Sequence, residues 1–164
     1  MANVKPIPEG YHTITPGLVL KGATKAIEFY KKAFGAEVKM NMANPDGRVM
    51  HAELKIGDSM LFVGDEFPEW APDNKSPQTA GAVTGSVFLY VNDTDAAFKR
   101  AVDAGAKPLM PPADMFWGDR FAKVIDPFGH HWGIATHKED LTPAQMDVRR
   151  KEWEKQMAQQ PPQK

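Results

Sequence analysis

The sequence predicts an α+β fold in which tandem βαβββ modules form a curled sheet around a concave cavity, followed by a C-terminal helix. One order of β-patterned and amphipathic segments occurs twice within the 164 residues. Gly35-Ala36 and Gly105-Ala106 end the two helical segments, 70 positions apart (105 − 35). A connection at 65–85, rich in proline and small polar residues, separates the two halves. One module alone leaves a sheet face uncovered, whereas two can enclose a concavity, the natural place for a ligand.

The composition excludes several classes of protein. Twenty basic residues balance twenty-one acidic ones, so no global charge favours nucleic acid or an anionic membrane. Cysteine is absent, which excludes disulfides, thiolate metal sites and cysteine nucleophiles. No apolar run approaches the roughly 18 residues that a membrane-spanning helix needs. The polar first ten residues, with two prolines, lack the order of a signal peptide, so we expect a cytoplasmic protein.

The first module is expected at about 12–64. Segment 13–20 has the composition of a strand, and Pro16 places that strand at a sheet edge or a bulge. Segment 24–34 has apolar residues at helical spacing, with lysine and glutamate on the other side. A turn is predicted at 44–47, from Asn-Pro-Asp-Gly. The remaining strands of this module are expected at 37–42, 50–56 and 59–63.

The second module is expected at about 86–137, which makes residues 1–138 a single domain. It repeats the first with a helix at 93–104, a turn-rich loop at 111–118, and strands at 86–91, 107–110, 120–125 and 130–136. Residues 139–164 are expected to form a helix and tail. Thr142-Pro143-Ala144-Gln145 is a capping box with proline at the first helical position. Met146, Trp153 and Met157 can form one stripe on that helix, which would cover either this chain's sheet or a partner chain.

Three segments resemble one known superfamily. Residues 26–36 are similar to the first helix of vicinal oxygen chelate proteins, the glyoxalase, bleomycin resistance and extradiol dioxygenase superfamily. Asp126-Pro127-Phe128-Gly129 resembles their most recognisable motif, and residues 114–120 resemble a loop of the PhnB-like branch, in which an aromatic pair precedes the seventh strand. The resemblance covers about 12–138 and implies the two-module fold, usually dimeric. Its members range from metal-dependent isomerases to metal-free drug-binding proteins, so the site must decide the function.

The resemblance also implies where a metal would be held. In metal-using members, four side chains from the first and fourth strand of each module hold one divalent ion through His, Glu or Gln. Counting from the helix starts and the Asp-Pro-Phe-Gly motif places these positions at Thr15, Phe62, Ser86 and Gly133. None of the four is a plausible primary ligand, and a shift of one residue restores no full set. We therefore expect no cofactor, and a divalent metal at another place is the disfavoured alternative.

His51 and Glu53 are the candidate catalytic residues, because residues two apart share one face of a strand. The pair can bind a metal, or act as a base and its orienting carboxylate. Alternatively it is an ordinary polar strand face with solvated or mutually hydrogen-bonded side chains. The apolar alternation from Met50 to Ile56 should meet the helix, so the His51 face should look into the cavity. His130 and His131 face opposite sides of a strand, and a structural role is expected for them.

The predicted ligand-binding residues are Phe62, Tyr90, Trp117 and Arg120. Phe62 occupies a position where the resemblance implies a metal ligand. Tyr90 lies on the same strand face as Ser86, which is an implied ligand position of the second module. Trp117 either covers the cavity or lies in an interface. Arg120 binds a carboxylate or phosphate, or pairs with Asp119 or Asp114.

The long connection contains Trp70. We expect this side chain, with its neighbours Phe67 and Pro68, to anchor the connection to the body; a mobile lid is the functional alternative.

These observations favour a PhnB-like glyoxalase/bleomycin-resistance-type protein that binds a small molecule in a cavity lacking the usual metal ligands. The balanced charge does not indicate the acidic groove of a bleomycin binder. The alternative is a glyoxalase-like lyase or isomerase that uses His51 and Glu53, with or without a divalent metal. A third hypothesis is a regulatory subunit that dimerises through the terminal helix. The expected partners are a small-molecule ligand and a second copy in a homodimer, with no nucleic acid and no membrane.

Overall fold

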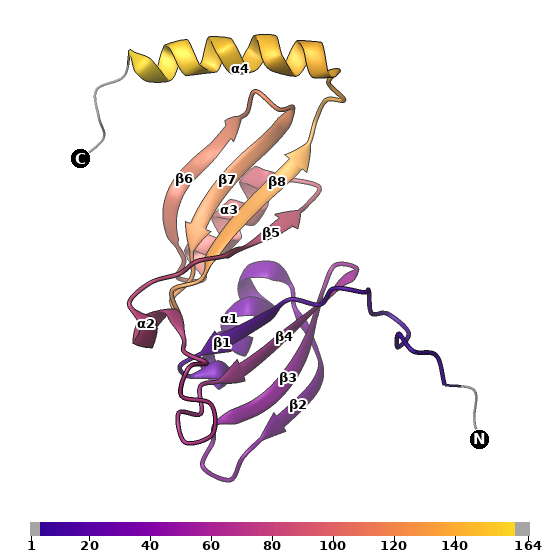
Figure 1. Cartoon of the computed structure of the whole chain (residues 1–164), viewed down its shortest axis with the longest axis vertical. Helices are drawn as coiled ribbons and strands as arrows, with labels where there is room; N and C mark the ends of the chain where they lie inside the picture. The colour runs from indigo at the N-terminus through magenta and orange to yellow at the C-terminus, as the bar shows by residue number, and fades with distance from the viewer. Residues whose placement is uncertain (1–3, 160–164) are drawn as a thin grey trace.

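The computed structural model describes residues 4–159 as two four-stranded sheets joined in tandem (Figure 1). The first module contains β1 (Gly17–Leu20), α1 (Ala23–Phe34), β2 (Glu37–Ala43), β3 (Val49–Ile56) and β4 (Ser59–Asp65). The second contains β5 (Ser86–Tyr90), α3 (Thr94–Asp103), β6 (Lys107–Asp114), β7 (Asp119–Ile125) and β8 (His131–His137). Helix α2 (Pro77–Ala80) lies in the connection, and α4 (Pro143–Ala158) follows the second module.

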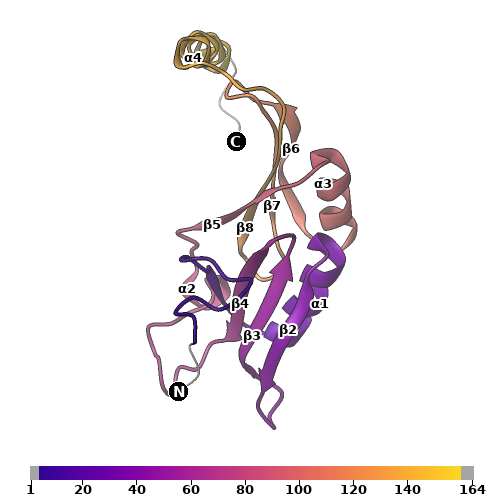
Figure 2. The same ribbon diagram turned by 90° about the vertical axis from the view of Figure 1, so that its right-hand side faces the viewer.

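Both sheets have the same topology. Their strand orders are β1-β4-β3-β2 and β5-β8-β7-β6, and in each the first strand pairs in parallel with the fourth. All other neighbours are antiparallel. The predicted α+β class, with tandem βαβββ modules and a C-terminal helix, is therefore confirmed. Figure 2 shows α1 and α3 on one side of the curved sheets, while the other face of each sheet is open.

Two predicted strand boundaries were wrong by four residues, and one helix was not predicted. Strand β1 begins at Gly17 rather than at 13; Pro16 lies just outside it, and β1 is an edge strand as expected. Strand β6 continues to Asp114, through the first half of the predicted loop, despite prolines at 108, 111 and 112. It tolerates them because it is an edge strand of the second sheet and its pairing with β7 shifts register twice. The connection also contains the unexpected helix α2, whose N-cap Ser76 accepts a hydrogen bond from the Thr79 amide.

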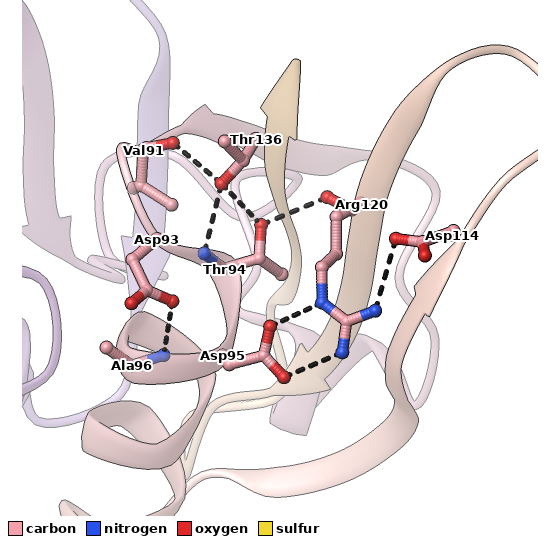
Figure 3. Close-up of polar contacts among 8 residues, drawn as sticks. All are labelled: Val91, Asp93, Thr94, Asp95, Ala96, Asp114, Arg120 and Thr136. Atoms are coloured by element: carbon pink, nitrogen blue, oxygen red, sulfur yellow. Dashed lines mark hydrogen bonds and ion pairs between the residues drawn. The ribbon is translucent and has the colours of Figure 1, made fainter. Parts of the chain in front are cut away.

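A residue near the end of each fourth strand anchors the N-terminus of its own module's helix, by a different chemistry in each module. Asp65 Oδ1 accepts hydrogen bonds from the amides of Gly22 and Ala23, at 2.7 and 2.9 Å, at the start of α1. In the second module, Thr136 Oγ1 accepts from the Thr94 amide at 3.0 Å and donates to the Val91 carbonyl at 2.9 Å (Figure 3). Both arrangements satisfy helix N-terminal amides that would otherwise lack acceptors. The helices are thus fastened to the same side of both sheets.

The two modules meet at a buried carboxylate in the Asp-Pro-Phe-Gly motif. Asp126 Oδ2 accepts hydrogen bonds from the Tyr30 hydroxyl of α1 at 2.8 Å and from Trp132 Nε1 of β8 at 2.9 Å. Its Oδ1 accepts from the amides of Phe128 and His130, each at 2.9 Å. Burial and the neighbouring carboxylate raise the pKa of the Tyr30 hydroxyl well above its ordinary value, so this group stays a donor.

Aromatic packing surrounds this carboxylate. The rings of Tyr30 and Phe34 lie 5.2 and 4.4 Å from that of Trp132, so α1 of one module packs on β8 of the other. His130 Nε2 lies 3.0 Å from the Val19 carbonyl of β1. His130 therefore has the structural role expected for it.

We predict that Asp126→Ala lowers the free energy of unfolding by about 2–6 kcal/mol, because two buried side-chain donors lose their acceptor at about 1–3 kcal/mol each. Tyr30→Phe removes one donor and leaves the carboxylate bonded, so it should cost about 1 kcal/mol. Urea titration followed by circular dichroism measures both. Equal losses in the two variants would contradict a carboxylate shared between the modules.

Candidate functional site

The open face of the first sheet carries the predicted pair on β3. Ala52 and Leu54 are fully buried on the side of α1, and His51 and Glu53 lie on the other face, as expected. The alternation fails at the start of the strand. There a register shift pairs Ala43 with Val49, so Val49 takes the buried position and Met50 is exposed.

Glu53 joins a tyrosine and a histidine on this face. The Tyr11 hydroxyl donates a hydrogen bond to Glu53 Oε2, and His51 Nε2 lies 3.2 Å from Oε1. The hydrogen bond from Tyr11 is the main reason that the pKa of the Glu53 carboxyl lies below its ordinary value; His51 lowers it further. The same bond raises the pKa of the Tyr11 hydroxyl. Glu53 is therefore an ionised acceptor that orients the imidazole, rather than a general acid.

Sequence reasoning missed Tyr11. It lies in the irregular arm before β1, 42 positions from Glu53 in sequence, where no periodicity indicates a partner. The only available signal was an aromatic residue bearing a hydroxyl just before the first strand.

Phe62 of β4 completes this cluster. It lies opposite Glu53 in the sheet register, and its ring makes an edge contact with His51 at 4.9 Å and a tilted one with Tyr11 at 6.1 Å. A cavity of about 430 Å³ lies beside His51 and Phe62, between β1, β3, β4 and the segment that follows β4. The structure thus brings together three of the predicted site residues, His51, Glu53 and Phe62.

A wider cleft of about 890 Å³ lies between the modules, along β5 and the turn between β3 and β4. Two of its acidic side chains already have local partners. Asp93 Oδ1 accepts from the Ala96 amide at 3.0 Å, and Asp58 accepts from the Ser59 hydroxyl at 2.8 Å. His12, Thr15, Asn92 and Arg100 also line this cleft, and none of them belongs to the His51 cluster.

The open face of the second sheet is aromatic. Phe88 and Phe121 are stacked, with centroids 5.6 Å apart and planes 14° apart. The ring of Tyr90 lies 5.1 Å from that of Phe88, and the ring of Trp117 lies 5.8 Å from that of Phe121. Tyr90 and Trp117 therefore share one surface, although they are separate from the His51 cluster.

Asp119 holds this aromatic group in place. Its Oδ2 accepts hydrogen bonds from the Tyr90 hydroxyl and from Trp117 Nε1, each at 3.1 Å, and its Oδ1 lies 2.8 Å from His137 Nδ1. The bond to the carboxylate raises the pKa of Tyr90. His137 also contacts Asp140 at 3.0 Å, and the two carboxylates raise the pKa of its imidazole, the Asp119 hydrogen bond being the larger cause. Sequence reasoning did not find this cluster, because its members come from three strands and a loop.

Arg120 does not face this surface, which corrects its predicted place in the cavity lining. Strand alternation turns it toward α3, where Nη2 is 2.8 Å from Asp95 Oδ1 and Nε bonds Oδ2 (Figure 3). Its Nη1 lies 3.1 Å from Asp114, which confirms the alternative that Arg120 pairs with Asp119 or Asp114. The guanidinium lowers the pKa of the Asp95 carboxyl.

The four positions implied for a metal do not fit one. Phe62 and Gly133 occupy corresponding places in β4 and β8, opposite Gly17 and Phe88. A Cβ atom built on Gly133 would lie 2.9 Å from Phe88 Cδ2 and 3.0 Å from Phe121 Cε2, so the ring stack fills the space where a ligand side chain would project. Across residues 4–159, no group of three or more His, Asp or Glu side chains is placed to hold a metal ion.

Helix α4 barely touches the rest of the chain. It meets the body through the rings of Trp153 and Phe116, 5.5 Å apart, and through the ion pair of Arg149 with Glu139 at 2.7 Å. Met146, Trp153 and Met157 are each at least a third exposed. The stripe expected on this helix does not cover the chain's own sheet. Within the described residues, no helix has the length and apolarity to cross a membrane.

Comparison with known proteins agrees with this architecture. The family model described as the Glyoxalase/Bleomycin resistance protein/Dioxygenase superfamily matches residues 12–134, more than half of the chain. An uncharacterised Mycobacterium tuberculosis protein is 38% identical over 122 residues, 74% of this chain and 72% of that protein.

Solved structures share the fold. A gene product of Arabidopsis thaliana has a TM-score of 0.61 at 29% identity, covering 76% of this chain and 98% of that one. A PhnB protein from Bacillus cereus has a TM-score of 0.58 at 19% identity, covering 76% and 99% of the two chains. With its two βαβββ modules and its Asp126-Pro127-Phe128-Gly129 turn, the chain belongs to the glyoxalase/bleomycin resistance protein/dioxygenase superfamily, which is the vicinal oxygen chelate superfamily.

Proposed function

We propose that this protein binds a small molecule on the open face of its first sheet, without the metal ligands usual in its superfamily. The observation that carries the proposal is the cluster of Tyr11, His51, Glu53 and Phe62 beside a cavity of about 430 Å³. Ligand sites typically combine apolar and aromatic walls with a few fixed polar groups, and this cluster has both. The cytoplasmic location expected from the sequence is part of the proposal.

A homodimer is the second part of the proposal. Phe88 and Tyr90 are 46% and 66% exposed on the open face of the second sheet. Helix α4 presents Met146, Trp153 and Met157, also without a covering element. Exposed apolar surface of this extent is typical of an interface. We infer that a second copy covers these surfaces and thereby encloses the ligand cavity.

The second candidate function is a glyoxalase-like lyase or isomerase. It is supported by the hydrogen-bonded chain from Tyr11 through Glu53 to His51. An ionised carboxylate that holds an imidazole in one orientation is the arrangement of a general base and its orienting group. In this mechanism His51 Nδ1 takes a proton from one substrate atom and returns it to another, while Glu53 stabilises the intervening imidazolium through Nε2, with or without a divalent metal.

We predict that fragment screening by protein-observed NMR finds compounds that shift signals of the His51 face. His51→Ala should weaken their binding about tenfold, the loss of one hydrogen bond of about 1–1.5 kcal/mol. His12→Ala is the matched control, since His12 is exposed and outside the cluster. Fragments that bind only elsewhere, or equally well to His51→Ala, would contradict the proposed site.

The same pair of variants separates the two candidate functions. If a bound compound is turned over, His51→Ala should abolish turnover while His12→Ala retains it. Turnover that survives His51→Ala would exclude the acid–base candidate without excluding ligand binding.

We predict a dimer at micromolar concentration, measured by light scattering after size exclusion. Trp153→Glu should raise the dimer dissociation constant about 30-fold or more, as expected for an aromatic interface anchor worth about 2 kcal/mol. Arg150→Glu changes charge on the same helix without removing an apolar side chain and serves as the control. A monomeric wild-type protein would show that the exposed surfaces have another use.

Elemental analysis of the purified protein should find no stoichiometric nickel, zinc, iron or manganese, because Phe62 and Gly133 offer no donor atoms at two of the four implied positions. Dialysis against a chelator should leave fragment affinity unchanged. One tightly held divalent ion per chain would contradict this part of the proposal.

A further inference from the structure

The long connection forms an aromatic wall beside the His51 face. We propose that the segment 66–76 binds one face of a planar aromatic ring through Trp70, so that the protein's ligands are planar aromatic compounds with a hydrogen-bonding substituent. The inference rests on the proposed ligand site and specifies the chemical class of its occupant. It assigns to Trp70 a role in specificity.

Three side chains form a layered stack that ends at Trp70. The guanidinium carbon of Arg48 lies 4.4 Å from the centre of the Phe67 ring, a cation–π contact. On Phe67 the ring of Trp70 is stacked at 4.9 Å with an interplanar angle of 4°. Phe67 is 7% exposed, whereas Trp70 is 64% exposed. Phe67 is therefore the buried anchor of the connection, and the role expected for Trp70 was wrong.

Ion pairs hold the Arg48 end of the stack, and hydrogen bonds hold the start of the segment. Arg48 forms ion pairs with Asp46 at 2.9 Å and with Glu69 at 2.8 Å. At the start of the segment, the carboxylate of Glu66 accepts hydrogen bonds from the Ser76 amide at 3.0 Å and the Thr79 hydroxyl at 2.6 Å.

Hydrogen bonds within the segment add to these constraints. The amides of Trp70 and Ala71 both donate to the Phe67 carbonyl, at 3.0 and 2.9 Å. Trp70 is therefore preorganised, and the protein loses little conformational freedom when a ligand ring stacks on it.

The surroundings of Trp70 favour a small molecule over a flat protein surface. Trp70 lines the same open cavity of about 430 Å³ as His51 and Phe62, so one ligand can contact all three side chains. The cavity also exposes the side chains of His51 and Asn74, which can hydrogen-bond a substituent on the ring. Aromatic rings prefer stacked partners, with a gain beyond the apolar area that they bury. A planar ring with one hydroxyl or amino group fits both features.

The experiment compares 2-naphthol with decahydro-2-naphthol, which has the same hydroxyl on a saturated, non-planar skeleton. The indole N–H signals of the four tryptophans report the location of binding, each assigned from a Trp→Phe variant. We expect 2-naphthol to shift the Trp70 signal and to bind at least fivefold more tightly than the saturated compound. Trp70→Leu should weaken 2-naphthol about fivefold, and Trp70→Phe should retain part of the affinity. Leu109→Ala removes an exposed apolar side chain of β6 and should change nothing.

Each alternative result has a distinct meaning. If 2-naphthol shifts Trp117 and not Trp70, the aromatic wall is overturned while small-molecule binding stands. Equal affinity for the two compounds, or unchanged affinity in Trp70→Leu, would also overturn it. If Trp70→Leu converts a dimer to a monomer, Trp70 belongs to the interface between copies. If neither compound binds, the aromatic class is overturned, and the fragment screen on His51→Ala decides separately whether the site itself survives.

Discussion

The buried carboxylate of Asp126 joins the two modules, because it accepts hydrogen bonds from Tyr30 of one and Trp132 of the other. An ionisable group without partners in such a place would cost several kcal/mol, so these donors are required by the burial itself. The aromatic rings around it form the common core of the two modules. The Asp-Pro-Phe-Gly motif therefore has two roles. It reverses the chain before β8, and its Asp126 holds the two modules together.

This junction decides which faces of the sheets stay open. With α1 and α3 packed against each other on one side, the opposite faces of both sheets face outward (Figure 2). His51 and Glu53 lie on one of these faces, and Tyr90 and Trp117 beside the other. Two separate clusters in a single chain follow from this arrangement, and only an additional element or a second copy can cover them.

The two open faces differ in chemistry at several matching positions, and one of these is Phe62 on β4 against Gly133 on β8. Phe62 leaves room for His51 and Glu53 beside it, whereas Gly133 lets Phe88 and Phe121 stack across the strand. A metal-binding side chain at Gly133 would displace that stack. The exchange of metal ligands for aromatic contacts is thus a packing change as well as a loss of donor atoms.

The sequence by itself determined the repeated βαβββ order, the helix ends at Gly35 and Gly105, and the face of β3 that carries His51 and Glu53. These features depend on local periodicity and on backbone conformation, which each segment specifies alone. Only the tertiary structure decided that Tyr11 bonds Glu53, that Asp119 gathers Tyr90 and Trp117, and that Arg120 turns to Asp95. Those contacts join segments from 2 to 42 positions apart. Their partners are selected by strand register, edge position and the side on which the helices pack, and no local pattern encodes these.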